Sequence, residues 1–201
     1  MAIRYVYVPD LKSNYIKLIP VEFKWNGGFS LTQKQKNIQS LHNAFKQIDG
    51  NQNKKILEVS SKSPEDLGKK LSAFNLLKYV PSLDKKLPVE CCFQSGKIFE
   101  NGGPFLDLLS AEPAKAKKDP RLFHSGKLIA FQFENHIFPL EPKTRFYDYL
   151  YISALKENKD LANLLLTYDG FTDIEFNPAR SINCQARSCA LFVSNKKSQR
   201  L

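Results

Sequence analysis

Alternating apolar and polar residues mark the start of the chain and several later stretches. "IRYVYVPD" (residues 3–10) and "YIKLIPVEFKW" (residues 15–25) both alternate and enclose the turn-forming "PDLKSN", which predicts two short strands. Alternation also predicts a strand in "KILEVSS" (residues 55–61), a hairpin in "KLIAFQFENHIFPLE" (residues 127–141) and a strand in "FTDIEFN" (residues 171–177). Strands are therefore expected near both ends of the chain and in its middle.

Apolar residues at helical spacing predict the helices between these strands. The first helix has its apolar positions three or four residues apart and ends at "DGNQNKK" (Ile38, Leu41, Phe45, Ile48). Ser63 is expected to cap the next helix, with Pro64 at its first position. Residues 88–99 are expected to form a helix, and later helical segments are expected in 101–109, from 112 onward, and in 144–157, 159–168 and 181–193.

This mixture of strands and helices, without an internal repeat, predicts an α+β fold in a single, predominantly helical domain. We expect residues 1–55 to be an N-terminal extension of short strands and one helix that packs on the main domain. Residues 56–195 would then form the main domain, and residues 196–201 a flexible tail.

The composition is typical of a globular protein, with 42% hydrophobic and 25% charged residues in a chain of 201. No run approaches the roughly 20 apolar residues that a membrane span needs. The start of the chain lacks the charged-then-apolar layout of a secretory signal, so a cytoplasmic protein without a membrane partner is expected.

The net charge of +10 is unevenly distributed. Residues 1–100 carry 16 basic and 9 acidic side chains, whereas residues 101–201 carry 14 and 11. A basic surface favours a polyanionic partner such as nucleic acid, or a phosphate-bearing substrate. A lysine-rich solvated surface without any such partner gives the same count, so charge alone leaves both interpretations open.

The cysteines and histidines do not form a pattern that binds metal. Cys91 and Cys92 are adjacent, and Cys184 and Cys189 fall in one expected helix. This is neither a zinc spacing nor a secreted disulfide framework, so buried free thiols are expected. The three histidines are scattered without ligand spacing, and no metal is assigned.

The segment "VECCFQSGKIF" (residues 89–99) carries polar residues at positions where a core helix would have leucine. Read as a helix, it places Glu90, Gln94 and Lys97 at i, i+4 and i+7, on one face. Either this face is a solvated stripe, or its charged groups point into a pocket. Periodicity alone does not decide between the two.

Two neighbouring stretches resemble a known family. "LSAFN" (residues 71–75), followed by "VECCFQSGKIF", is similar to the paired LSNFY and (T/V)EHxFQxxKF segments of the NADAR family, also called YbiA-like. "AEPAKAKKDPR", "NKDLANLLLTY" and "SINCQARSCALFV" resemble later helices of that family, so that the resemblance covers residues 56–195. It implies the NADAR-like fold for this part of the chain.

The departures from the family pattern point to one subgroup. The asparagine of LSNFY is replaced, with Asn75 after the phenylalanine instead of before it, and Cys91 stands where the family has histidine. A middle tryptophan segment is replaced by the hairpin of residues 127–141. These changes resemble NADAR proteins encoded beside DarT-type toxins. That resemblance implies a cofactor-free glycohydrolase that removes ADP-ribose from guanine bases of nucleic acid, with the cognate ADP-ribosyltransferase toxin as a possible partner.

Cleaving an N-glycosidic bond leaves positive charge on the anomeric carbon, which a nearby carboxylate stabilises. The resemblance makes Glu90 the candidate for this catalytic role. For Lys97 three roles stay open: it binds the diphosphate, protonates the leaving base, or attacks the opened ribose as a neutral amine to give a Schiff base. Gln94 is expected to hydrogen-bond ribose hydroxyls. Ser72, Phe74 and Asn75 are expected to bind substrate.

For each of the remaining candidate residues, a purely structural role is the alternative to substrate binding. Asn101 and Gly102 either close over the substrate or form a helix-ending turn. Asp173 and Glu175 alternate along an expected strand and supply either substrate contacts, including a second carboxylate, or a solvated edge. Asn183 shares an expected helix face with Arg187, and either binds an anion or bonds the chain nearby.

Two other functions remain open from the sequence. A small-molecule N-glycosidase, acting on a phosphorylated nucleoside-like metabolite, would use the same Glu90 and Lys97. A non-catalytic antitoxin that binds nucleic acid or the toxin itself would rely on the scattered lysines. The choice between DNA and RNA is also open.

Overall fold

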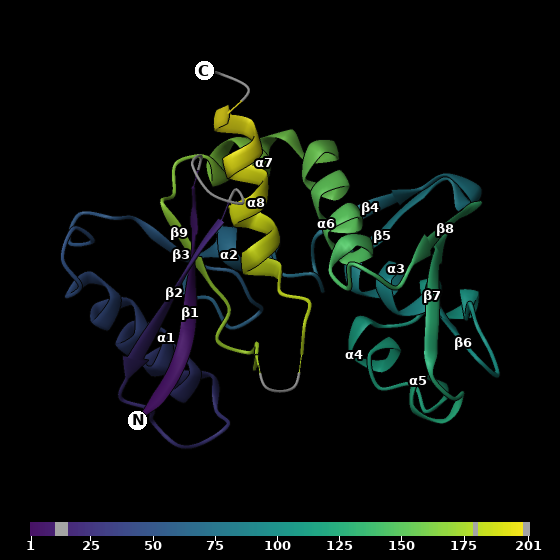
Figure 1. Cartoon of the computed structure of the whole chain (residues 1–201), viewed down its shortest axis with the longest axis horizontal. Helices are drawn as coiled ribbons and strands as arrows, with labels where there is room; N and C mark the ends of the chain where they lie inside the picture. Colours follow the sequence, from purple (N-terminus) through teal and green to yellow (C-terminus); the bar gives the residue numbers. More distant parts are fainter. Residues whose placement is uncertain (11–15, 179–180, 199–201) are drawn as a thin grey trace. The chain divides into compact units, whose positions relative to one another are not determined.

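Strands and helices alternate along the chain in a computed structural model that describes residues 1–10, 16–178 and 181–198 (Figure 1). Strands form three sheets within these residues, so the α+β class is confirmed, whereas a predominance of helix is not evident. By their internal contacts the residues group into two units. We call residues 1–72 with 160–201 the sheet unit and residues 73–159 the central unit.

The sheet unit is built on the two predicted N-terminal strands. β1 (Ala2–Pro9) and β2 (Ile16–Phe23) are antiparallel, in a register that pairs Ala2 with Phe23. β9 (Gly170–Thr172) lies antiparallel to β1 and parallel to β3 (Ile56–Glu58), which gives the order β2-β1-β9-β3. Residues 1–55 therefore share a sheet with strands from the expected main domain. A domain boundary at residue 55 stays a prediction.

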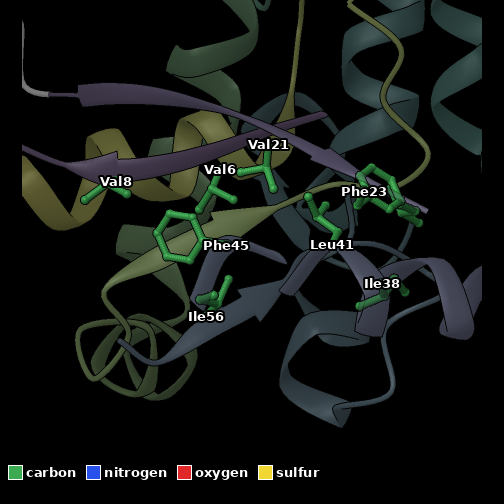
Figure 2. Close-up of a cluster of buried hydrophobic side chains, with 9 residues drawn as sticks. Val6, Val8, Val21, Phe23, Ile38, Leu41, Phe45 and Ile56 are labelled. Atoms are coloured by element: carbon green, nitrogen blue, oxygen red, sulfur yellow. The ribbon is translucent and has the colours of Figure 1, made fainter. Parts of the chain in front are cut away.

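Helix α1 (Leu31–Lys46) closes one face of this sheet. It begins at Ser30, whose hydroxyl accepts a hydrogen bond from the Gln33 amide (3.3 Å), a common N-cap arrangement. Its apolar stripe packs on alternate residues of β1 and β2, as expected for a sheet with one face against a helix. Figure 2 shows the resulting core, which is formed by Val6, Val8, Val21, Phe23, Ile38, Leu41, Phe45, Ile56 and Ile174.

Phe45→Ala should destabilise the protein strongly, because the side chain is fully buried in this core. Truncating a buried phenylalanine removes its burial energy and leaves a cavity, at a cost of about 3–5 kcal/mol. Urea unfolding should show a lower midpoint with an unchanged slope. Phe29→Ala is the matched control, because the Phe29 side chain is 96% exposed, and its midpoint should stay at the wild-type value. Equal midpoints for both variants would contradict this core.

The other helices of the sheet unit differ in their ends from the sequence prediction. α2 (Asp66–Lys70) begins after the expected cap, because the buried Ser63 hydroxyl accepts from the Glu65 amide (3.2 Å) in a turn that precedes the helix. α7 (Lys159–Leu165) begins as expected but ends three residues before the predicted end at Tyr168. α8 (Gln185–Ser198) contacts β1 and β9. Residues 196–198 of the expected tail are helical, and 199–201 lie outside the described residues.

The central unit contains the other two sheets and the segment that resembles the NADAR family. β4 (Leu77–Val80), the 3-10 turn η1 (Pro81–Leu83) and β5 (Lys85–Pro88) form a hairpin that the sequence did not predict. The predicted hairpin at 127–141 is confirmed as β7 (Leu128–Phe133) and β8 (His136–Pro139). The helices are α3 (Val89–Ser95), η2 (Leu106–Ser110), α4 (Pro113–Ala116), α5 (Arg121–His124) and α6 (Arg145–Glu157).

The helix predicted over residues 88–99 is wrong in its second half. α3 ends at Ser95, and Lys97 opens a strand, β6 (Lys97–Phe99), that pairs with β7 opposite Phe131. The cause lies at Gly96, whose carbonyl accepts from the Gln132 amide (2.7 Å). A side chain at this position would collide with the Gln132 carbonyl and the Phe146 ring, so the chain leaves the helix where β7 comes close.

An aromatic cluster joins α3 to the rest of the central unit. Phe93 meets the Tyr147 ring edge-on (centroids 5.1 Å apart) and stacks with Phe131 (5.7 Å), while Phe131 stacks on Phe146 (4.8 Å). Such pairs add about 0.5–1.5 kcal/mol each beyond the area they bury. All residues of α3 are buried, so the whole helix is part of the interior.

The thiols follow the sequence prediction. Cys91, Cys92, Cys184 and Cys189 are all free and buried. Burial raises the pKa of Cys91 to about 11 and that of Cys92 to about 12, so both stay protonated and unreactive at neutral pH.

Within residues 1–10, 16–178 and 181–198, no helix is long and apolar enough to cross a bilayer.

Candidate active site

Glu90 is fixed by the segment that precedes it in the chain. The backbone amide of Val89 donates to the Leu76 carbonyl (2.9 Å), and that of Glu90 donates to the Ala73 carbonyl (2.9 Å). These bonds satisfy amides in the first turn of α3 that no residue of the helix itself can accept. Ala73, within the "LSAFN" segment, and Leu76, just after it, thus hold the start of α3.

The polar face of α3 is buried rather than solvated. Glu90 and Gln94 are each only 5% exposed, which excludes the interpretation as a solvated stripe. The Gln94 side-chain amide donates to Glu90 Oε1 (2.8 Å), as the predicted i, i+4 spacing allows. The oxygen of that amide, Gln94 Oε1, is buried and accepts no hydrogen bond from the described residues. It is an acceptor placed beside a carboxylate and suited to a ligand hydroxyl.

Lys97 lies near Glu90, but its local structure differs from the predicted helix. It lies on β6 instead of two helical turns beyond Glu90, and its ammonium is 5.0 Å from the centre of the Phe93 ring. Burial, opposed by the Glu90 carboxylate and helped by the positive charge of Lys117, lowers the pKa of Lys97 to about 8. The two predicted catalytic groups therefore interact, and the lysine holds a substantial neutral fraction near physiological pH.

Lys117 is a residue of this site that the sequence analysis did not single out. It forms the C-cap of α4, is exposed, and places its ammonium 5.6 Å from the centre of the half-buried Phe74 ring. Its effect on the Lys97 pKa places its charge near Lys97. The signal was present in "AEPAKAKKDPR", one of the stretches that resembles the family. The structure thus brings together Phe74, Glu90, Gln94, Lys97 and Lys117, with Asn75 exposed next to Phe74.

Asn101 and Gly102 belong to a turn between strands, so the predicted alternative of a helix-ending turn is wrong. The Phe99 amide donates to the Gly102 carbonyl (2.7 Å), and the Asn101 amide donates to the Ser125 carbonyl (3.0 Å). Gly103 has φ +89° and packs against the Lys97 backbone so closely that a side chain would collide with it. The turn supports the strand that carries Lys97, and a role in closing over substrate stays a prediction.

The expected strand around Asp173 and Glu175 is also wrong. β9 ends at Thr172, and Asp173 Oδ1 accepts from the amides of Glu175 (3.1 Å) and Phe176 (3.2 Å) in a tight turn. Glu175 forms an ion pair with Lys34 of α1 (2.8 Å). Both carboxylates therefore have structural roles within the sheet unit. Their participation in substrate binding stays a prediction.

Two further predicted residues lie in the sheet unit. Ser72 is buried, and its amide donates to the Lys69 carbonyl (3.1 Å). Asn183 precedes α8, so the predicted helix face shared with Arg187 is wrong. The side-chain oxygen of Asn183 is buried and accepts no hydrogen bond from the described residues. For both residues a substrate contact remains a prediction.

The described residues contain no group of three histidine, cysteine or acidic side chains placed to hold a metal ion. What the assembled residues offer is a buried carboxylate, a neighbouring amine of lowered pKa, an unbonded amide oxygen and an exposed cation over an aromatic ring. This set suits acid–base or nucleophilic chemistry on a polar, anionic ligand.

The comparisons with known proteins agree with the sequence resemblance. Searching among curated proteins gave no match. The family model described as the DarT1-associated NADAR antitoxin matches residues 2–201, which includes the first 55 residues that the sequence resemblance did not cover. On this match, the chain belongs to the family of DarT1-associated NADAR antitoxins.

Proposed function

We propose that this antitoxin is a glycohydrolase that removes ADP-ribose from guanine bases of nucleic acid and so reverses the modification made by a DarT-type toxin. The observation that carries the proposal is the buried pair Glu90 and Gln94 beside the half-buried Lys97, in a family defined by its association with that toxin. A carboxylate held out of water beside an amine is costly to maintain, which supports a functional reason for it.

Glu90 has the chemistry that the departing sugar requires. Breaking the bond between the anomeric carbon and the guanine nitrogen leaves positive charge on the sugar, which the Glu90 carboxylate stabilises. Gln94 holds one oxygen of that carboxylate by its 2.8 Å hydrogen bond and turns its own unbonded Oε1 to the ribose hydroxyls. The carboxylate is thus oriented before substrate arrives.

Of the three roles left open for Lys97, attack by the neutral amine is the one that its environment favours. With a pKa of about 8, a substantial fraction of the amine is unprotonated at neutral pH. When the ribose ring opens, the bond from the anomeric carbon to the ring oxygen breaks, the oxygen takes up a proton, and the carbon becomes an imine of the guanine nitrogen. The Lys97 nitrogen then adds to this carbon and passes a proton to the guanine nitrogen, which leaves as an amine. Water then adds to this lysine imine, frees the amine and gives ADP-ribose as the aldehyde, which closes to its ring form.

Lys117 is the better candidate to bind the diphosphate. It is exposed and lies over Phe74, whereas Lys97 is half-buried and its lowered pKa disfavours the charged form. A solvated ammonium attracts phosphate as a point charge at little desolvation cost. Lys117 would then bind the diphosphate of ADP-ribose, and Lys97 would act on its anomeric carbon.

The pH profile of Lys117→Gln tests this division. Since the neutral form of Lys97 is required, kcat/KM of the wild type should rise with pH through the Lys97 pKa of about 8. Removing the neighbouring positive charge raises that pKa, so the rising limb should move to higher pH. Lys118→Gln, an exposed neighbour, is the control and should leave the limb in place. A limb that falls with increasing pH would instead assign Lys97 as an acid.

The proposal itself is tested with a guanine-ADP-ribosylated oligonucleotide. The protein should release free ADP-ribose in many turnovers, and should relieve growth arrest when it is expressed with a DarT-type toxin. Relief of growth arrest without release of ADP-ribose would favour a non-catalytic antitoxin. Release from a modified nucleoside but not from the oligonucleotide would favour a small-molecule N-glycosidase.

A further inference from the structure

Phe29 is the most exposed large hydrophobic residue among those described, with 96% of its surface in contact with solvent. It lies in the loop 24–30 that joins β2 to α1, together with Trp25, the only tryptophan of the chain. Isolated exposed apolar residues are common on proteins and need no explanation by themselves. Phe29 differs from such residues in the anchored loop that carries it and in the basic residues of the same region.

The loop that carries Phe29 is held firmly in place. The buried Asn37 of α1 accepts from the Asn26 backbone amide (2.6 Å) and donates from its own side chain to the Asn26 carbonyl (3.0 Å). Ser40 donates to the Lys24 carbonyl (2.9 Å), which ties the start of the loop to the same helix. The loop is thus fixed at Lys24 and Asn26, and Ser30, the residue after Phe29, is fixed as the N-cap of α1. Anchors on both sides of Phe29 limit the conformational entropy that is lost when a ligand binds.

Positive charge gathers in the part of the chain that carries this ring, where two of the cations lie over Trp25 of the same loop. Residues 1–55 carry nine basic and three acidic side chains, which is +6 of the total +10. The Arg4 guanidinium and the Lys34 ammonium lie 5.3 and 5.9 Å from the centre of the Trp25 ring, and Lys24 and Lys36 are exposed nearby in the chain. Glu175 neutralises Lys34, but the surplus of cations remains.

An exposed aromatic ring among cations is the chemistry that binds single-stranded nucleic acid. An unpaired base stacks on the ring with little regard to sequence, while lysines and arginines follow the phosphates. Bases in a duplex are already stacked on one another and leave no face for Phe29. We propose that the loop 24–30 and the start of α1 form a binding surface for single-stranded nucleic acid, with Phe29 as its stacking residue.

This inference deepens the proposed function, on which it rests for the kind of polyanion, and it assigns a role to residues 1–55. Binding to an unmodified strand needs no turnover, so it is measured independently of hydrolysis. Trp25 serves as an intrinsic probe, since its indole emission responds to a ligand bound beside it. A short oligothymidine is a suitable ligand because it does not pair with itself.

Titrating oligothymidine should change the Trp25 emission, and Phe29→Ala should raise the Kd about tenfold, the usual loss for one stacked base. Phe123→Ala, which removes another largely exposed phenylalanine (69%) from the central unit, should leave the Kd unchanged. A duplex of the same length should bind more weakly. In wild type, log Kd should rise with log salt, and Lys36→Gln should reduce that slope.

Hydrolysis gives a second reading that separates this inference from the proposed function. Phe29→Ala should raise KM for a modified oligonucleotide while leaving kcat/KM for a modified nucleoside unchanged. Tight oligothymidine binding by a protein without hydrolase activity would reject the proposed function and keep this surface. Equal Kd values for wild type and Phe29→Ala would overturn the surface, and would direct attention to a protein partner for Phe29.

Discussion

Glu90→Gln is expected to lower kcat/KM on a guanine-ADP-ribosylated oligonucleotide by about 1,000-fold, the loss typical of removing a catalytic carboxylate. The substitution is nearly isosteric, and the glutamine oxygen can still accept the hydrogen bond from Gln94. The fold should therefore persist while the negative charge at the anomeric carbon is lost. Rates of ADP-ribose release under single-turnover conditions would measure the effect on the chemical step.

The control for Glu90→Gln is a carboxylate of the same unit outside the site. Glu141 is exposed and makes only a long ion pair with Lys143 (3.9 Å), so Glu141→Gln should retain the wild-type rate. Thermal unfolding should give both variants a midpoint close to that of the wild type. A Glu90→Gln variant that is folded and turns over at the wild-type rate would show that Glu90 is not the catalytic carboxylate.

Lys97→Arg has the second largest expected effect, a loss of about 100-fold or more in kcat. Arginine keeps the positive charge but stays protonated at every accessible pH, so it cannot supply a neutral nucleophile. Borohydride added during turnover should trap a covalent ADP-ribose adduct on the wild-type protein, which mass spectrometry would locate at Lys97. The same treatment of Lys97→Arg should give no adduct.

The opposite result would assign Lys97 a different role. If arginine restored most of the rate and no adduct formed on the wild type, the residue would act as a point charge on the diphosphate. Lys117→Arg is the comparison here, because a solvated point charge tolerates that exchange. We expect Lys117→Arg to retain most of the activity, in contrast to Lys97→Arg.

Much of the secondary structure could be predicted from the sequence because its pattern is local. The apolar stripe of α1 and the alternation in β1, β2, β7 and β8 follow from one buried face per element. The β4–β5 hairpin was missed because its determinants are distant. Lys78 of β4 is buried with its ammonium paired with Glu157 of α6 and bonded to the Tyr79 carbonyl, whereas a lysine in a short segment predicts a loop.

The end of α3 could not be read from the sequence for a similar reason. "VECCFQSGKIF" continues at helical spacing through Lys97, and Gly96 alone is weak evidence for a stop. The helix ends there because the backbone of β7, more than thirty residues later, occupies the space that a side chain would need. The helical spacing that pairs Lys97 with Glu90 is therefore not the local structure of the chain, and the catalytic role of Lys97 stays a prediction.

Some residues of the candidate site could likewise be predicted from local spacing, and others could not. Glu90 and Gln94 could be paired in advance, since i, i+4 spacing on a helix places them in contact. Lys117 lies in a stretch that resembles the family, but the spacing within that stretch does not indicate that α4 lies near Lys97. Asp173 and Glu175 were misread as strand residues, since a turn that closes on an aspartate oxygen interrupts the alternation after Thr172.

The most direct test of this account is the mass of the oligonucleotide strand after reaction with the protein. Cleavage between the ribose of ADP-ribose and the guanine nitrogen predicts that the modified strand returns to the mass of the unmodified strand, with free ADP-ribose in equal amount. The Glu90→Gln variant should leave the modified mass unchanged. A strand that keeps its ADP-ribose with the wild type, or that loses the guanine together with it, would contradict the account.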